Sequence, residues 1–74
     1  MRIISQDGSI DIDYGRSTLL ASDKGCLYAA TPEHTRLLLA KYPSIDIACN
    51  VMSVVRTRFI DGWPAYRLPF YKGD

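Results

Sequence analysis

The sequence has few of the residues that hold small proteins together through covalent bonds or metals. Among 74 residues there are two cysteines, Cys26 and Cys49, and one histidine, His34. Two thiols without CxxC spacing and a lone imidazole predict neither a disulfide framework nor a zinc site. We therefore expect no metal and no cofactor. Because the core of so short a chain is marginal, we expect self-association to add stability.

Strong charge of one sign and long apolar runs are also missing. Nine Lys and Arg residues against eight Asp and Glu residues give a formal net charge of +1, which is far from the basic footprint of a general nucleic-acid-binding protein. No apolar run approaches the roughly 20 residues of a membrane span, and residues 1–14 carry acids where a signal peptide needs an apolar core. These absences predict a cytoplasmic protein that binds neither nucleic acid nor membrane.

No group of residues has the spacing of a catalytic site. His34 has no Ser or Cys at an informative distance along the chain, and there is no Gly-rich phosphate loop. Asp11 and Asp13 alternate along a strand-like segment, where exposed acids are common. His34 follows a Pro-Glu turn and is expected at the surface. We predict that the protein is not an enzyme.

The N-terminal part of the chain has the pattern of a β-hairpin. Strand-like residues at 2–5 and 10–13 flank an Asp-Gly dipeptide. Asp-Gly favours a two-residue hairpin turn in which both central residues have positive φ. This turn predicts an apolar pair and an ion pair across the hairpin, Ile3 with Ile12 and Arg2 with Asp13.

A second hairpin is predicted between strands at 17–21 and 26–31. Asp23 and Lys24 suit the centre of a type I turn, and Gly25 supplies the left-handed residue that begins a bulge. The two hairpins together give four antiparallel strands.

The Leu-rich segment 35–42 indicates a buried central strand. A helix over 34–41 is the alternative, because Leu, Ala, Arg and Lys are good helix formers. With this strand, the sequence predicts a single α+β domain over residues 1–74, in which an antiparallel β-meander of about five strands packs on one α-helix.

Residues 45–61 are predicted to form that helix. Ser44 can cap its free N–H groups, Asp46 suits the positive end of its dipole, and Gly62 followed by Pro64 ends it. At about 100° per residue, one face of the helix is apolar and should cover the sheet. This face consists of Ile45, Ala48, Cys49, Met52, Val55, Phe59 and Ile60.

A second apolar patch, formed by Ile47, Val51 and Val54, lies beside that face and leaves only a narrow polar edge. One small sheet does not cover so wide an apolar surface. We expect either a second copy of the chain or the aromatic C-terminal segment to cover this patch. The first of these gives a homodimer or a higher homo-oligomer.

Arg56 falls within the apolar face of the predicted helix. A guanidinium there needs acceptors, because burying it unpaired costs several kcal/mol. Its stem can lie along the edge of the core while its head pairs with Asp46, Asp61 or a strand carboxylate. Alternatively, Arg56 points into a pocket that accepts an anionic group such as phosphate.

The C-terminal stretch RTRFIDGWPAYRLPFY, residues 56–71, gathers five aromatic residues and three arginines. Its alternation after Gly62 predicts a short strand, which Pro69 restricts to a sheet edge. The aromatic residues can form a lid on the core. Alternatively, they stack on a purine ring while the arginines bind phosphate. The candidate ligand-binding residues are Arg56, Arg58, Trp63, Tyr66, Arg67 and Tyr71.

The chain opens with MRIISQDG, includes Asp11 and Tyr14, and later contains KYPS at 41–44, VM at 51–52 and AYRLPFY at 65–71. In these segments it resembles a family of small, uncharacterised proteins from Gram-positive bacteria and their phages. It departs from their pattern at Asp13, where the family has Pro, and at Gly15, where the family has Glu. The resemblance implies antiparallel strands plus one helix, and it implies no catalytic residue.

Two functions follow as expectations. By analogy with small phage accessory proteins, we expect a non-enzymatic phage or prophage protein that counters bacterial defence by binding and sequestering a small nucleotide immune signal. The alternative is an inhibitor or adaptor that covers a host protein with one side of its helix or with its edge strand. Either would act in the cytoplasm of a bacterial host cell.

Overall fold

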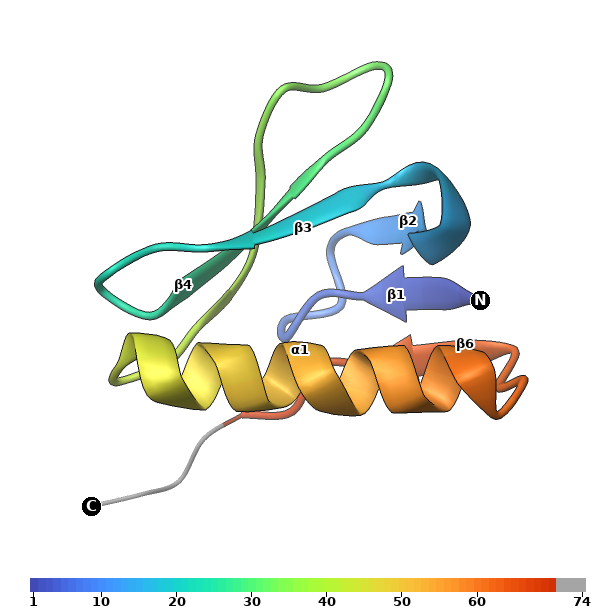
Figure 1. Ribbon diagram of the computed structural model, residues 1–74. Coiled ribbons are helices and arrows are strands. Elements are labelled where there is room, and N and C mark those ends of the chain that lie inside the picture. Colours follow the sequence, from blue (N-terminus) through green and yellow to red (C-terminus); the bar gives the residue numbers. More distant parts are fainter. Residues whose placement is uncertain (71–74) are drawn as a thin grey trace.

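The structure, a computed structural model, describes residues 1–70 (Figure 1). The predicted α+β class is confirmed, and so is the presence of each strand segment and of the helix. In chain order the elements are β1 (Arg2–Ile4), β2 (Asp11–Asp13), the 3₁₀ helix η1 (Tyr14–Arg16), β3 (Thr18–Ala21), β4 (Cys26–Ala30), β5 (Leu37–Lys41), α1 (Ile45–Ile60) and β6 (Ala65–Arg67).

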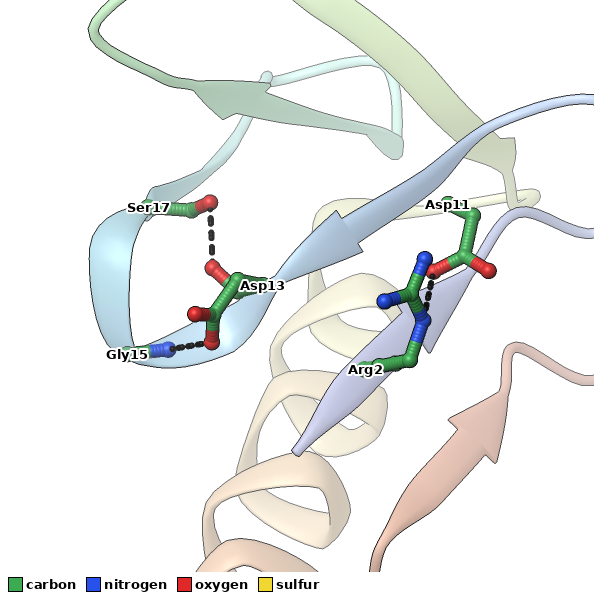
Figure 2. A network of polar contacts seen from close by, with 5 residues as sticks. All are labelled: Arg2, Asp11, Asp13, Gly15 and Ser17. Carbon is green, nitrogen blue, oxygen red and sulfur yellow. Dashed lines mark hydrogen bonds and ion pairs between the residues drawn. The ribbon is translucent and has the colours of Figure 1, made fainter.

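The strands in the described part of the chain form two sheets of three strands each, with the orders β2-β1-β6 and β3-β4-β5. The predicted meander is therefore wrong at the step from β2 to β3, which do not pair. The reason lies in η1, where the Asp13 carboxylate accepts a hydrogen bond from the Gly15 N–H (3.0 Å) and Ser17 Oγ donates to the Asp13 carbonyl (2.7 Å). Figure 2 shows these contacts closing the turn that separates the two sheets.

The first hairpin has the predicted register, with Ile3 opposite Ile12 and Arg2 opposite Asp13. The predicted ion pair between Arg2 and Asp13 is wrong. Arg2 Nε instead contacts the Asp11 carboxylate at 3.0 Å (Figure 2). Because Asp13 is used to cap η1, its diagonal neighbour on the same face of the strand takes the guanidinium.

The turn of this hairpin also differs from the prediction. Gly8 has a φ of 78°, but no other residue of the turn has positive φ. The Gly8 N–H donates to the Ser5 carbonyl at 3.0 Å. The Asp7 carboxylate accepts hydrogen bonds from Ser9 Oγ (2.7 Å), Ser9 N–H (2.9 Å) and Ser5 Oγ (2.8 Å). These bonds, those from Ser9 first, lower the pKa of Asp7 to about 2.

The second hairpin is confirmed in its turn type. The Gly25 N–H donates to the Ser22 carbonyl at 2.9 Å, the Ser22 N–H donates to the Cys26 carbonyl at 2.9 Å, and Gly25 has a φ of 88°. A Cβ at Gly25 would lie 2.3 Å from the Tyr42 carbonyl oxygen. Glycine is therefore required at this position both by its backbone conformation and by the neighbouring strand.

Segment 35–42 forms a strand and not a helix, but β5 lies at an edge of its sheet and not at the centre. A bulge shifts the register between β4 and β5, so that Leu39 and Ala40, which follow each other in the chain, are both buried. The outer edge of β5 meets Gln6, whose N–H donates to the Leu39 carbonyl at 3.0 Å. This contact joins the first hairpin to the second sheet.

The helix begins where it was predicted to begin. The Ser44 side chain accepts a hydrogen bond from the Ile47 N–H, and Asp46 lies in the first turn. The last helical residue is Ile60, one residue before the predicted end.

The predicted covering face of α1 is only partly correct. Ala48 and Val55 are fully buried, but Cys49 is exposed and Ile60 is 74% exposed. The buried face of α1 is therefore rotated from the predicted face toward the second apolar patch. Ile47 and Val51 of that patch pack against the core of the same chain, and so does Met52. Two of the three residues of the patch are therefore partly covered within one copy, while Val54 is 37% exposed.

The core draws on both sheets, the helix and the C-terminal segment. Fully buried apolar side chains in such positions stabilise the fold by about 1.5–3 kcal/mol each. The buried apolar residues are Ile3, Ile12, Leu27, Ala29, Leu39, Ala40, Tyr42, Ala48, Val55 and Leu68.

The predicted C-terminal edge strand is confirmed as β6, which pairs with β1 in parallel. The Arg2 N–H donates to the Pro64 carbonyl at 3.0 Å, and the Leu68 N–H donates to the Ile4 carbonyl at 2.9 Å. The chain thus returns through α1 to the strand with which it began. Within residues 1–70 no helix has both the length and the apolarity to cross a membrane.

Candidate functional site

The C-terminal end of α1 brings two of the predicted site residues together. The helix stops at Asp61, and Gly62 follows with a φ of 83°. The Trp63 N–H then donates to the Arg58 carbonyl and the Gly62 N–H to the Phe59 carbonyl, both at 3.1 Å. This is the Schellman arrangement, in which the second residue after the cap folds back over the last helical turn. Trp63 is placed over Arg58 by this backbone geometry.

Three of the six predicted residues form one cluster, which we call the Arg-Trp-Tyr cluster: Arg58, Trp63 and Tyr66. The Arg58 guanidinium carbon lies 4.4 Å from the centre of the Trp63 ring, within the range of a cation-π contact. The Tyr66 ring meets Trp63 edge-on, with ring centres 6.2 Å apart and planes at 67°. Tyr66 comes from β6, so the cluster joins the end of the helix to the edge strand.

The electrostatics of this cluster are incomplete within the described residues. Arg58 Nε is buried and has no hydrogen-bond partner in the described part of the chain. The ion pair found there joins Arg2 to Asp11, so it does not neutralise Arg58. A buried donor without an acceptor costs about 1–3 kcal/mol. Trp63 is still 43% exposed. The cluster therefore has an accessible aromatic ring and a positive charge that has no counterion among residues 1–70.

Arg67 lies elsewhere. It follows Tyr66 on a strand, so its side chain points to the opposite face. Arg67 Nη2 donates to the Gln6 carbonyl at 3.0 Å and passes over Gly8, where an added Cβ would lie 3.5 Å away. Arg67 thus ties β6 to the turn of the first hairpin.

Arg56 is exposed, so the expectation that it lies within the covering face of the helix is wrong. The rotation of the helix about its axis moves this position out of the core. Arg56 lines an open hollow of about 410 Å³ together with Tyr14 and Phe59. These two aromatic rings pack against each other with centres 4.9 Å apart. Arg56 and Arg67 do not converge on one cavity.

The last predicted residue, Tyr71, lies outside the described residues. Phe70, the residue before it, is 63% exposed. Phe70 borders a hollow lined by Gln6 and β5, whereas Trp63 lies beside Arg58. These two aromatic residues therefore belong to different parts of the surface.

Sequence reasoning missed a polar junction around Gln6, which is 9% exposed. Its side chain accepts a hydrogen bond from the Lys41 N–H (2.9 Å) and donates to the Pro69 carbonyl (3.0 Å). The Tyr42 hydroxyl donates to the same Pro69 carbonyl at 2.8 Å. Burial, and then the neighbouring Tyr66, raise the pKa of Tyr42 to about 12. Gln6 stands beside a turn, where polar residues are common, so nothing in the sequence indicates that its side chain joins distant segments.

The two sheets also leave a hollow of about 500 Å³ between β2 and the segment that leads into β5. Asp11, Asp13, Glu33 and His34 line it. Within residues 1–70, however, no three His, Cys, Asp or Glu side chains are grouped so that they could hold a metal ion. His34 is exposed in a turn closed by its hydrogen bonds with Thr31.

Comparison with known proteins identifies no relative: no family model, curated protein or solved structure matches the chain.

Proposed function

We propose that the protein is a non-enzymatic binding protein that sequesters a small nucleotide, with the Arg-Trp-Tyr cluster as the centre of its binding surface. Following the resemblance of its first eight residues, we place it among phage or prophage accessory proteins that counter nucleotide-based immune signalling in the bacterial cytoplasm. The observation that carries the proposal is the Arg58 guanidinium, which has no ion-pair partner among residues 1–70 and stacks 4.4 Å from the accessible Trp63 ring.

This pair supplies the two contacts that a nucleotide needs. An accessible indole can stack on any nucleotide base, and each such contact contributes about 1–3 kcal/mol of binding free energy. A guanidinium binds phosphate through a planar fork of donors. The formal net charge of +1 favours a small nucleotide over a long phosphate backbone, because polymer binding requires many neutralised phosphates.

Titration of the protein with cyclic dinucleotides and ADP-ribose-type nucleotides tests the proposal. Trp63 is the only tryptophan, so its fluorescence reports directly on the cluster. We expect one class of nucleotide to quench it and to be recovered intact after the protein is heated. Arg58→Gln and Trp63→Phe should each weaken binding by roughly tenfold or more, measured by isothermal titration calorimetry because Trp63→Phe removes the fluorophore.

Arg36→Gln is the matched control. Arg36 also stacks on an aromatic ring, with its guanidinium carbon 4.6 Å from the centre of Tyr28, but Tyr28 lies on β4 of the other sheet. Equal losses of affinity in Arg36→Gln and Arg58→Gln would mean that general charge, and not the cluster, binds the nucleotide. No quenching by any nucleotide of the panel would refute the proposal.

A second candidate, a protein-binding inhibitor or adaptor, is favoured by the apolar exposure beside the cluster. Ile60 is 74% and Phe59 44% exposed, next to Trp63 at the end of α1. Adjacent apolar side chains of this size are typical of protein interfaces. If Ile60→Asp abolishes capture of a host protein while nucleotides leave Trp63 fluorescence unchanged, the adaptor function replaces nucleotide sequestration.

A further inference from the structure

The two sheets have four edge strands within the described residues, and three of these edges are protected against further pairing. β2 carries Asp11 and Asp13, and charged residues on an edge oppose the approach of another strand. β6 is three residues long and lies between Pro64 and Pro69, which have no N–H to donate. The edge of β5 is covered by Gln6, which bonds to the backbone of Leu39 and Lys41.

The fourth edge, β3, lacks such protection. Its sequence is Thr-Leu-Leu-Ala, without charge or proline. The Ser22 N–H donates to Cys26 across the hairpin, and alternate residues of a strand direct their backbone groups to opposite edges. The N–H and C=O groups of Leu19 and Ala21 therefore point away from β4. Among residues 1–70, no backbone hydrogen bond is made by these four groups on the side of β3 that faces away from β4.

An apolar row reaches the same edge on the outer face of the sheet. Leu20 lies opposite Tyr28, and Tyr28 lies opposite Leu38, so that one side chain from each strand forms the row. Leu20 is 44% and Leu38 40% exposed. Leu19 and Ala21 face the other way and pack against the core. An unpaired edge and an exposed apolar side chain thus coincide at Leu20.

We propose that β3 pairs antiparallel with β3 of a second copy of this chain, joining the two three-stranded sheets into one across a homodimer. A two-fold axis through such a pair requires a residue to lie opposite its own counterpart. With Leu20 on the axis, the free backbone groups of Leu19 meet those of Ala21 in the second copy, and the reverse. The edge is therefore complementary to itself.

The register follows from the apolar row. Leu20 opposite Leu20 makes a non-hydrogen-bonded pair, in which side chains are closest, and it extends the row from Leu38 across both copies. Placing Leu19 on the axis would satisfy the same backbone groups, but Leu20 would then lie opposite Thr18. Only the first register covers Leu20 with another leucine.

This dimer does not depend on the Arg-Trp-Tyr cluster. It also uses a different surface from the second apolar patch of the helix, on which the sequence-based expectation of self-association rested. Ile47 and Val51 of that patch are already packed within the chain. The dimer proposal and the nucleotide proposal can therefore fail separately.

Sedimentation equilibrium of the full chain tests the proposal. We expect the wild-type protein to sediment at twice the 8.3 kDa mass of the chain. Leu20→Lys places two like charges opposite each other at the axis and should raise the dissociation constant by roughly tenfold or more. Leu38→Lys is the matched control, since Leu38 lies in the same row with similar exposure but at the far edge, and it should remain dimeric.

Cysteine cross-linking tests the register. In a background with Cys26→Ser and Cys49→Ser, Leu20→Cys should form a disulfide between copies under mild oxidation, because non-hydrogen-bonded pairs have Cα atoms about 4.5 Å apart and disulfides accept about 4.4–6.8 Å. Leu38→Cys in the same background should not. A monomeric wild-type protein would overturn the proposal. So would a dimer that survives Leu20→Lys but dissociates on Ile60→Lys, which would place the interface on the helix.

Discussion

The polar junction around Gln6 and the Arg-Trp-Tyr cluster both combine arginine, aromatic and turn residues, but they differ in how fully their polar groups are paired. At the junction, Gln6 bonds through its backbone and both ends of its amide, and Arg67 donates to its carbonyl. At the cluster, Arg58 Nε is buried without a hydrogen-bond partner among the residues that the structure describes. Saturated polar groups serve the fold, whereas the charge of Arg58 is not used by the described part of the fold and lies beside a ring that is 43% exposed.

Replacing Gln6 should give the largest effect on stability and is the most direct way to break this comparison. Gln6→Leu leaves the Lys41 N–H and the Pro69 carbonyl without their amide partner. We expect a loss of about 2–4 kcal/mol in the free energy of unfolding, measured by urea denaturation. Arg58→Gln should lose less than about 1 kcal/mol. Similar losses in the two variants would show that the cluster is as structural as the junction.

Tyr42 sharpens the comparison through pH. Tyr42→Phe removes the hydrogen bond to Pro69 and should cost about 1 kcal/mol near neutral pH. Because the pKa of Tyr42 is raised from 10.0 to about 12, the folded state holds the phenol proton more tightly than the unfolded state, and this contribution is lost as pH rises from 10 to 12. Urea midpoints of the two proteins should therefore converge over this interval. A constant difference would show that Tyr42 ionises as freely as in the unfolded chain.

Arg67→Gln tests whether Arg67, which follows Tyr66 on β6, differs in function from Arg58 of the Arg-Trp-Tyr cluster. Arg67 donates to a backbone carbonyl, so its loss should lower the free energy of unfolding by about 1 kcal/mol and leave Trp63 fluorescence titrations unchanged. Arg58→Gln should show the opposite pattern, with a small change in stability and a large change in binding. Loss of nucleotide binding in Arg67→Gln, with the fold intact, would return Arg67 to the site.

Replacing Asp7 should give the smallest effect on stability, and this effect should disappear in acid. Its pKa is lowered from 3.8 to about 2, chiefly by the hydrogen bonds from Ser9. The stability it contributes is therefore present above pH 3.8 and is lost as pH falls toward 2. Wild-type protein should be more stable than Asp7→Asn at neutral pH, and thermal unfolding of the two should converge below pH 3. A difference that persists in acid would assign the effect to the turn geometry and not to the charge.

The sequence predicted what is decided locally. Register in the first hairpin, the bulge glycine at Gly25 and the Ser44 cap all follow from a few adjacent residues, and all are confirmed. The break between the sheets was missed because it depends on one carboxylate turning back to Gly15.

The candidate site was predictable only in part, for a related reason. Arg58, Trp63 and Tyr66 meet because the chain turns at Gly62 and β6 then runs back beside β1. The turn at Gly62 was predicted from the sequence, but the pairing of β6 with β1 was not. Arg56 was misplaced because a helix with two adjacent apolar patches does not specify its own rotation. Gln6 was missed because its partners lie 35 and 63 residues away.

The parallel pairing of β1 with β6 has a consequence for how the protein is made. Arg2 lies opposite Ala65, so β1 is synthesised about 60 residues before its partner strand. At about 5–20 residues per second, β1 waits several seconds with one side unpaired. During this interval Ile3, which ends fully buried, is sheltered only by the first hairpin. The sheet that contains β1 therefore cannot be completed until β6 has been synthesised.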